Sequence, residues 1–131
     1  MNSNGKSILV VDDERDIANQ IKRSLESVDG FKACTFTDPF AALEHFNLGY
    51  EDHQIVISDI RMPGMNGYEF LKQVKNINPQ VKVIFMTAFD IDDKEFYNVL
   101  PSIKVDAFLQ KPFSIGQLND QIGKINSDNL Q

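Results

Sequence analysis

The chain has 131 residues, 42% of them hydrophobic, and carries a formal net charge of −6. This length suits one domain, which buries enough surface to fold without a disulfide or a structural metal. The acidic balance, with 19 Asp and Glu against 13 Lys and Arg, argues against direct binding to nucleic acid or an anionic membrane. No apolar run reaches the roughly 20 residues of a membrane span, and the polar amino-terminal segment lacks a signal core. We therefore expect a cytoplasmic protein without membrane insertion.

Strand-like and helix-like segments alternate along the chain. Short apolar runs predict strands, and apolar residues at helical spacing predict amphipathic helices. The expected elements, in chain order, are a strand at 7–11, a helix at 14–28, a strand at 31–36, a helix at 39–49, a strand at 54–58, a helix at 68–77, a strand at 81–86, a helix at 92–100, a strand at 107–109 and a helix with its apolar stripe at 115–125.

This alternation indicates a parallel sheet. Five β–α units with continuous apolar strands favour an α/β domain with helices on both faces of the sheet. Right-handed crossovers make the doubly wound form the natural solution, in which ligands bind at the carboxyl ends of the strands. We expect one domain over residues 1–131, with a core from about 6 to 125 and no output domain in this chain.

The residues with reactive side chains follow the predicted strands. Asp12 and Asp13 come after the first strand, and Asp59 ends the third. Thr87 ends the fourth strand, and Lys111 follows the fifth. Because the carboxyl ends of parallel strands meet at one edge, we expect three carboxylates, a hydroxyl and an amine to converge there.

Such a group of side chains suits phosphoryl transfer. Three neighbouring carboxylates repel one another, and a hard cation such as Mg²⁺ relieves that repulsion. A carboxylate can serve as the nucleophile and form an acyl phosphate. The ammonium and the hydroxyl can hold the other phosphoryl oxygens, and positioning with charge stabilisation is what this reaction needs most.

Four motifs carry a family resemblance that runs from about Lys6 to Ile125. They are VVDDERD, ISDIRMPGMNGYEFL, IFMTAFD and DAFLQKPF, in this order. The chain resembles the receiver domain of response regulators, the CheY-like family of two-component phosphorelay proteins. The resemblance implies a five-stranded, flavodoxin-like sheet with strand order 2-1-3-4-5. It also implies a signalling phosphoprotein that catalyses only its own aspartyl phosphorylation and dephosphorylation, and is not a dedicated enzyme.

The resemblance also assigns roles in binding metal and phosphate. Asp59 would accept the phosphoryl group from a histidine kinase or a histidine phosphotransfer protein. Asp13, Asp59 and the backbone carbonyl of Arg61 would bind Mg²⁺, or Mn²⁺ in its place, with Asp12 acting through water. Lys111 would contact the phosphoryl group, and its peptide bond to the following proline would be cis.

Signalling would reach a partner through the face formed by the fourth helix, fifth strand and last helix. Thr87 would move toward the phosphate, coupled to Phe108, and the altered face would bind a downstream protein target. Phe108 lacks the hydroxyl of the tyrosine often found there, and Pro101 should shorten the fourth helix.

We further expect slow loss of the phosphoryl group. In the family, the residues two positions after the acceptor and two after the threonine flank the path of the attacking water. Here they are Arg61 and Phe89. Arg61 is permanently protonated and Phe89 has no polar atom, so neither can act as a general base.

Three other functions compete with this interpretation. An aspartate-nucleophile phosphohydrolase needs a second aspartate two positions on, but Ile60 and Arg61 follow Asp59. A flavodoxin-like electron carrier needs a phosphate loop after the first strand, where the acidic residues would repel phosphate. A pseudo-receiver would bind partners without phosphate, which the intact acidic set disfavours.

The single cysteine and both histidines are expected to have ordinary roles. Cys34 lies in the short apolar-rich segment 31–36 and should be a buried or half-buried packing residue rather than a nucleophile. His45 and His53 have no metal-ligating neighbours at useful spacing along the chain, which predicts surface or packing roles.

Overall fold

The computed structural model describes residues 7–28, 31–49, 53–60, 62, 64–65, 67–87 and 105–129. The elements in chain order are β1 (Ser7–Val11), α1 (Arg15–Val28), β2 (Lys32–Phe36), α2 (Pro39–Gly49), β3 (His53–Asp59), α3 (Gly67–Ile77), β4 (Lys82–Thr87), β5 (Ala107–Gln110) and α5 (Ile115–Asn129). In these described ranges no helix combines the length and apolar character needed to cross a membrane.

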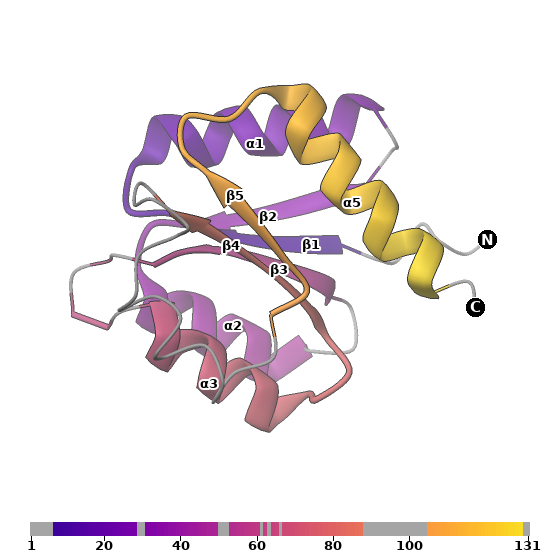
Figure 1. The fold of residues 1–131 in the computed structure, drawn as a ribbon. Coiled ribbons are helices and arrows are strands. Elements are labelled where there is room, and N and C mark those ends of the chain that lie inside the picture. Colours follow the sequence, from indigo (N-terminus) through magenta and orange to yellow (C-terminus); the bar gives the residue numbers. More distant parts are fainter. Residues whose placement is uncertain are drawn as a thin grey trace, which may run out of the picture.

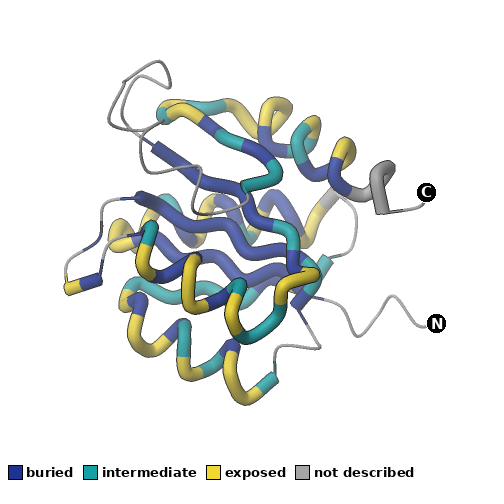
Figure 2. Tube along the Cα trace, turned by 60° about the horizontal axis from the view of Figure 1, so that its bottom comes forward, coloured by how far each residue is buried: buried dark blue, intermediate teal, exposed yellow. Residues whose placement is uncertain are grey.

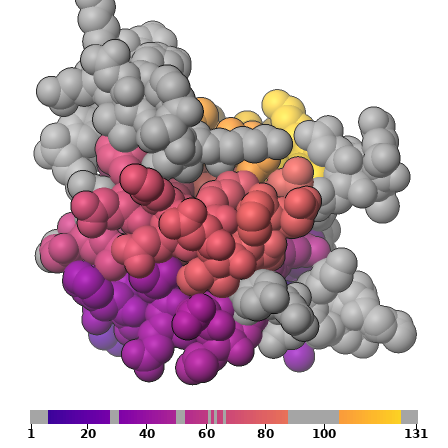
Figure 3. Space-filling view, turned by 90° about the horizontal axis from the view of Figure 1, so that it is seen from below, coloured from indigo at the N-terminus to yellow at the C-terminus, as the bar shows by residue number. Residues whose placement is uncertain are grey.

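The strands form one parallel sheet with the order β2-β1-β3-β4-β5. Helices α1 and α5 cover one face of this sheet, and α2 and α3 cover the other (Figure 1). Figure 3 looks onto the face covered by α2 and α3 and shows these two helices next to each other. The predicted doubly wound α/β fold and its strand order are therefore confirmed.

The element bounds differ from the prediction mainly at strand ends. The third strand was expected at 54–58 with Asp59 at its end; β3 begins one residue earlier, at His53, and ends at Asp59 as expected. His53 joins because it pairs with Ser7 of β1, and Asp59 joins because it pairs with Met86 of β4. Backbone pairing, rather than side-chain polarity, decides where a ladder ends. The helix expected at 92–100 and Pro101 lie outside the described residues.

The core has two layers, one on each side of the sheet. Side chains alternate along each strand, so Leu9 and Val11 of β1 face the α2–α3 layer, whereas Ile8 and Val10 face the α1–α5 layer. Every residue of β1 is buried, as the continuous apolar run predicted. Figure 2 shows the same pattern, with buried strands between helices that expose one side only. The sheet is thus a rigid support for the loops at its carboxyl edge.

Candidate functional site

The carboxyl edge of the sheet brings the predicted site residues together. Asp12 directly follows β1, Asp59 is the last residue of β3, Thr87 ends β4 and Lys111 directly follows β5. Asp12 and Thr87 are fully buried and Asp59 is 7% exposed, whereas Asp13 is exposed. Parallel pairing of β1, β3, β4 and β5 as neighbours places these side chains at one edge, as predicted.

Lys111 links the two buried aspartates. Its Nζ lies 2.8 Å from Asp12 Oδ2 and 3.1 Å from Asp59 Oδ2. Its backbone N–H donates to the carbonyl of Thr87 over 2.7 Å, which fixes the start of the loop after β5. The peptide bond between Lys111 and Pro112 is cis, as the resemblance implied. The lysine side chain therefore reaches both carboxylates from a firmly held backbone.

Each buried carboxylate is held by one backbone group as well. Asp12 Oδ1 accepts a hydrogen bond from the N–H of Glu14 at 2.9 Å, and Asp59 Oδ1 accepts one from the N–H of Ile60 at 2.8 Å. In both aspartates one oxygen binds the backbone and the other binds Lys111. The backbone thereby orients both carboxylates toward the ammonium.

Glu14 is a site residue that the sequence did not single out. Its Oε1 lies 3.9 Å from Lys111 Nζ, although the glutamate side chain is 65% exposed. An exposed pair at this distance contributes little to stability. Its position two residues after Asp12 was the only sequence signal that could have indicated it.

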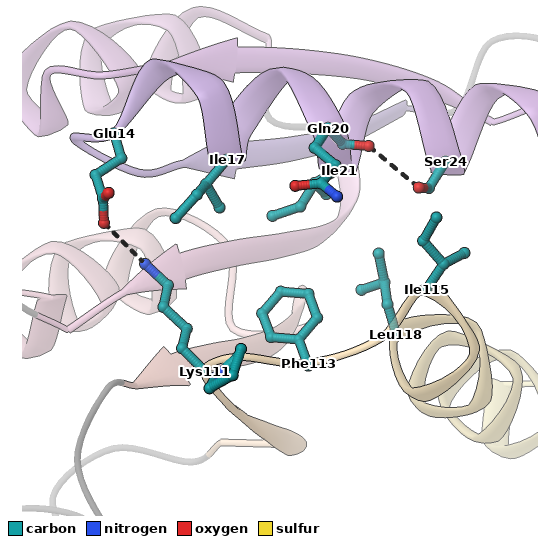
Figure 4. A pocket seen from close by; sticks show the side chains of 10 residues that line it. Glu14, Ile17, Gln20, Ile21, Ser24, Lys111, Phe113, Ile115 and Leu118 are labelled. Carbon is teal, nitrogen blue, oxygen red and sulfur yellow. Dashed lines mark hydrogen bonds and ion pairs between the residues drawn. The ribbon is translucent and has the colours of Figure 1, made fainter.

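An apolar pocket adjoins the site on the α1–α5 side of the sheet. Ile17, Phe113 and Leu118 line it, and Lys111 with Glu14 closes one end (Figure 4). The pocket and the charged group therefore have only Lys111 and Glu14 in common. The carboxylates themselves lie beyond that end of the pocket, at the edge of the sheet.

Burial dominates the electrostatics of Asp59. It raises the pKa of the Asp59 carboxyl above its usual value; attraction to Lys111 opposes this rise, and repulsion from Asp12 adds to it. For Lys111, burial alone would lower the pKa, but the hydrogen bonds and attractions to Asp12 and Asp59 outweigh it and raise the pKa. The side chain of Lys111 therefore stays charged, whereas burial makes the charged form of Asp59 less favourable.

We predict that Asp59→Asn stabilises the metal-free protein at neutral pH. Because the folded state raises this pKa, the contribution of Asp59 to folding is full below its unfolded pKa of about 4 and is lost as the pH rises through the folded pKa. The variant should therefore be more stable than the wild type at pH 7 in EDTA, and almost equally stable at acidic pH. Urea unfolding at several pH values measures this gain. Asp120→Asn, on the exposed surface of α5, is the control, and a destabilised Asp59→Asn at pH 7 would contradict the prediction.

The three aspartates form a possible metal site. Asp12, Asp13 and Asp59 each offer a carboxylate oxygen, and these oxygens lie within 4.8 Å of one another. Oxygen donors with this negative charge fit a hard cation such as Mg²⁺. The carbonyl of Arg61, the further predicted ligand, lies outside the described residues, as does Phe89.

Thr87 and Phe108 lie on neighbouring strands, as expected. Thr87 of β4 pairs in register with Gln110 of β5, and Phe108 pairs with Phe85. The rings of Phe85 and Phe108 have their centroids 6.5 Å apart, and Phe108 is half-buried. A displacement at the end of β4 can therefore be passed to the side chains of β5 by direct packing.

Gly67, the first residue of α3, lies directly against the backbone of Asp59 and Ile60. A Cβ at this position would lie 2.4 Å from the carbonyl oxygen of Asp59 and 2.7 Å from the Cα of Ile60. The Gly67 N–H also donates to the carbonyl of Ile60 over 2.6 Å. The loop between β3 and α3 thus closes so tightly that no side chain fits.

We predict that Gly67→Ala lowers stability by about 2–3 kcal/mol, because the added methyl group forces rigid backbone apart. Gly123→Ala in α5 is the matched control: nothing lies within 4 Å of its Cβ position, so it should stabilise by roughly 0.5–1 kcal/mol. Chemical denaturation measures both changes. Equal effects of the two substitutions would show that the contact at Asp59 has no energetic importance.

The structure changes the interpretation of the two histidines. Along the chain neither has a metal-ligating neighbour, but in space His45 and His53 lie together with Cys34. Cys34 is half-buried, as expected. Spacing along the chain does not indicate this group, because β2, α2 and β3 bring distant positions together.

Comparison with known proteins agrees with this geometry. The family model described as the response regulator receiver domain matches residues 8–123. Response regulator SaeR of Staphylococcus aureus strain USA300 is 32% identical over 111 residues, which are 85% of this chain and 46% of SaeR. The chain therefore spans about half the length of the curated relatives it matches.

Solved structures resemble the fold closely. A response regulator receiver domain protein from Clostridium thermocellum has a TM-score of 0.82 and 30% identity, covering 95% of this chain and 98% of that one. A CheY-like receiver domain protein from Methanospirillum hungatei has a TM-score of 0.84 and 25% identity, covering 94% of each chain. With the family model matched over most of its length, the chain belongs to the receiver domain family of two-component response regulators.

Proposed function

We propose that this protein is a phosphorylation-dependent signalling switch in which Asp59 accepts a phosphoryl group in the presence of Mg²⁺. The observation that supports this most directly is the double contact of Lys111 Nζ with Asp12 and Asp59 at the carboxyl edge of the sheet. A buried carboxylate beside a half-buried ammonium provides a nucleophile together with a cation for the incoming oxygens.

The transfer involves one bond formed and one broken. Asp59 Oδ2 attacks the phosphorus of a phosphohistidine, the bond between phosphorus and the imidazole nitrogen breaks, and the donor leaves as neutral imidazole after taking up a proton. The N–H of Ile60 holds Asp59 Oδ1 during this step. Asp13, Asp59 and the backbone carbonyl of Arg61, with Asp12 through water, would hold Mg²⁺, which would supply positive charge near the phosphoryl oxygens.

Lys111 and Thr87 bind the transferred group. In the unmodified protein the ammonium is shared between Asp12 and Asp59. Once Asp59 carries a phosphoryl group, Lys111 binds a phosphoryl oxygen instead of the carboxylate that has been consumed. Thr87, buried at the end of β4, donates its hydroxyl to another oxygen, since phosphate adds strong acceptors.

The donor and the target are proteins in this proposal. The donor is a histidine kinase or a histidine phosphotransfer protein, and the phosphorylated form binds a downstream protein through β5 and α5. The acidic net charge of −6 makes direct contact with nucleic acid unfavourable. Catalysis is limited to the protein's own phosphorylation and dephosphorylation.

The test uses a small phosphodonor and the whole chain. Acetyl phosphate with Mg²⁺ should add the mass of one phosphoryl group, measured by intact-protein mass spectrometry, and EDTA should prevent the addition. Hydroxylamine should remove the group, because acyl phosphates react with it. Binding of partners by a chain that never gains this mass would favour the pseudo-receiver alternative instead.

We predict that beryllofluoride with Mg²⁺, a stable phosphoryl mimic, shifts amide NMR signals of β5 and α5. The hydroxyl of Thr87 should bond the mimic and move, and the packing of Phe85 against Phe108 should pass the change to β5. In Thr87→Val, which keeps the shape and removes the hydroxyl, the shifts should be confined to the metal site. Equal shifts of β5 in the variant and the wild type would contradict this coupling.

A further inference from the structure

A second group of potential metal ligands lies away from the aspartates. Cys34 of β2, His45 of α2 and His53 of β3 each offer one ligand atom, and these atoms lie within 4.8 Å of one another. His53 begins β3 and Asp59 ends it, so a rise of about 3.3 Å per residue places the two groups about 20 Å apart. The group of Cys34, His45 and His53, here called the amino-edge cluster, is thus separate from the phosphorylation site.

His45 has a buried nitrogen without a partner. Its Nε2 is inaccessible to solvent and makes no hydrogen bond among the described residues. The ring contacts Phe36 and His53, with centroids 5.1 Å and 4.9 Å away. Leaving a polar atom unsatisfied in such a place is costly. This nitrogen would donate its lone pair to a bound metal ion, which would remove the cost of leaving it unsatisfied.

His53 is already oriented as a ligand. Its Nδ1 forms a hydrogen bond with Ser7 Oγ at 2.5 Å, and its ring stacks on Phe46 with centroids 6.0 Å apart. In metal sites the second ring nitrogen of a histidine ligand commonly donates to a neighbouring oxygen, which fixes the tautomer. Here Nδ1–H would donate to Ser7, and Nε2 would coordinate the metal.

The chemistry of the surrounding pocket selects the kind of ion. Among its described lining residues none is acidic; besides the amino-edge cluster they are Ser7, Lys32, Leu48 and Gly49. Without carboxylates the pocket does not suit Mg²⁺ or Ca²⁺, whereas a thiolate with two imidazoles suits Zn²⁺. Lys32 is exposed, so solvent screens its repulsion of a cation.

We propose that the amino-edge cluster binds Zn²⁺. Cys34 loses its proton to solvent and coordinates as a thiolate, His45 and His53 coordinate as neutral imidazoles, and water takes the fourth position. Tetrahedral Zn²⁺ requires ligand atoms about 3.3–3.6 Å apart. The three atoms now lie within 4.8 Å of one another, so they must approach by at most about 1.5 Å. Rotation of the Cys34 and His45 side chains supplies this change, because both are only half-buried.

The test uses Co²⁺ as a spectroscopic probe in the reduced, full-length chain. The background carries Asp13→Ala and Asp59→Asn, which removes binding by the aspartates. One equivalent of Co²⁺ should produce thiolate-to-cobalt absorption in the near ultraviolet, and one equivalent of Zn²⁺ should abolish it. Because Cys34 is the only cysteine, this absorption reports on one known atom.

Two variants separate ligation from folding. Cys34→Ser should abolish the absorption, and His45→Gln should weaken Zn²⁺ binding about 100-fold while leaving the bond between Ser7 and His53 intact. Both variants should keep the circular dichroism of the parent. Cobalt binding without the thiolate absorption, unchanged Zn²⁺ affinity in His45→Gln, or absorption that appears only when two chains associate would each overturn the proposal.

Discussion

Asp59→Asn is expected to eliminate the phosphoryl adduct completely. In the wild type, acetyl phosphate with Mg²⁺ should add the mass of one phosphoryl group, and in the variant the mass should not change. An amide oxygen is a far weaker nucleophile than a carboxylate and cannot form a stable acyl phosphate. The effect is therefore all or none, unlike the graded effects of residues that only assist the transfer.

The substitution is well suited to the test because it preserves shape. The side-chain oxygen of Asn can still accept from the N–H of Ile60, as Asp59 Oδ1 does, and Lys111 keeps its 2.8 Å contact with Asp12. Asp120→Asn, an equal chemical change at an exposed site on α5, should leave phosphorylation intact. A full single-phosphate adduct on Asp59→Asn would show that another residue is the acceptor.

The second large effect concerns the metal. Mg²⁺ should stabilise the folded protein by about 2.7 kcal/mol at 100 times its dissociation constant, because the unfolded chain does not hold the aspartates together. Asp13→Ala should lose most of this gain. Asp13 is exposed, so its removal should not disturb the core, and the variant should match the wild type in EDTA.

Urea unfolding with and without Mg²⁺ measures this difference. Asp16→Ala is the matched control, since Asp16 is also exposed and lies three positions further along, in the first turn of α1. Any change in its stability should be small and the same in both conditions, so that its gain from Mg²⁺ equals that of the wild type. Equal Mg²⁺ stabilisation of Asp13→Ala and the wild type would exclude Asp13 as a ligand.

The sequence predicted those parts of the structure that depend on local pattern. The run from Ile8 to Val11 is apolar throughout, and with Ser7 it forms a strand in which every residue is buried. An Asp followed by Pro is typical of a helix start, and Asp38 lies before Pro39 at the start of α2, where Asp38 Oδ1 accepts from the N–H of Phe40. A Ser followed three residues later by Gln is typical of a helix cap, and Ser114 and Gln117 form such a reciprocal cap at α5. Each of these patterns involves residues that are close together in the chain, so the sequence shows it directly.

Contacts between distant segments were harder to predict. Nothing near Gly67 in the chain shows that its missing side chain lies against the backbone of Asp59. The meeting of Cys34 with His45 and His53 likewise depends on how α2 lies over β2 and β3. The positions of Asp12, Asp59 and Lys111 could be predicted only because parallel topology aligns the ends of strands.

The link between Lys111 and Asp12 joins residues 99 positions apart in the chain. A polypeptide still emerging from the ribosome, or a proteolytic fragment without β5, would have the proposed acceptor Asp59 but not the Lys111 ammonium beside it. Such an incomplete chain could not pass on a signal, however well its first strands had formed. In the proposed switch, the response therefore requires the last strand to have joined the sheet, because only then does Lys111 reach both aspartates.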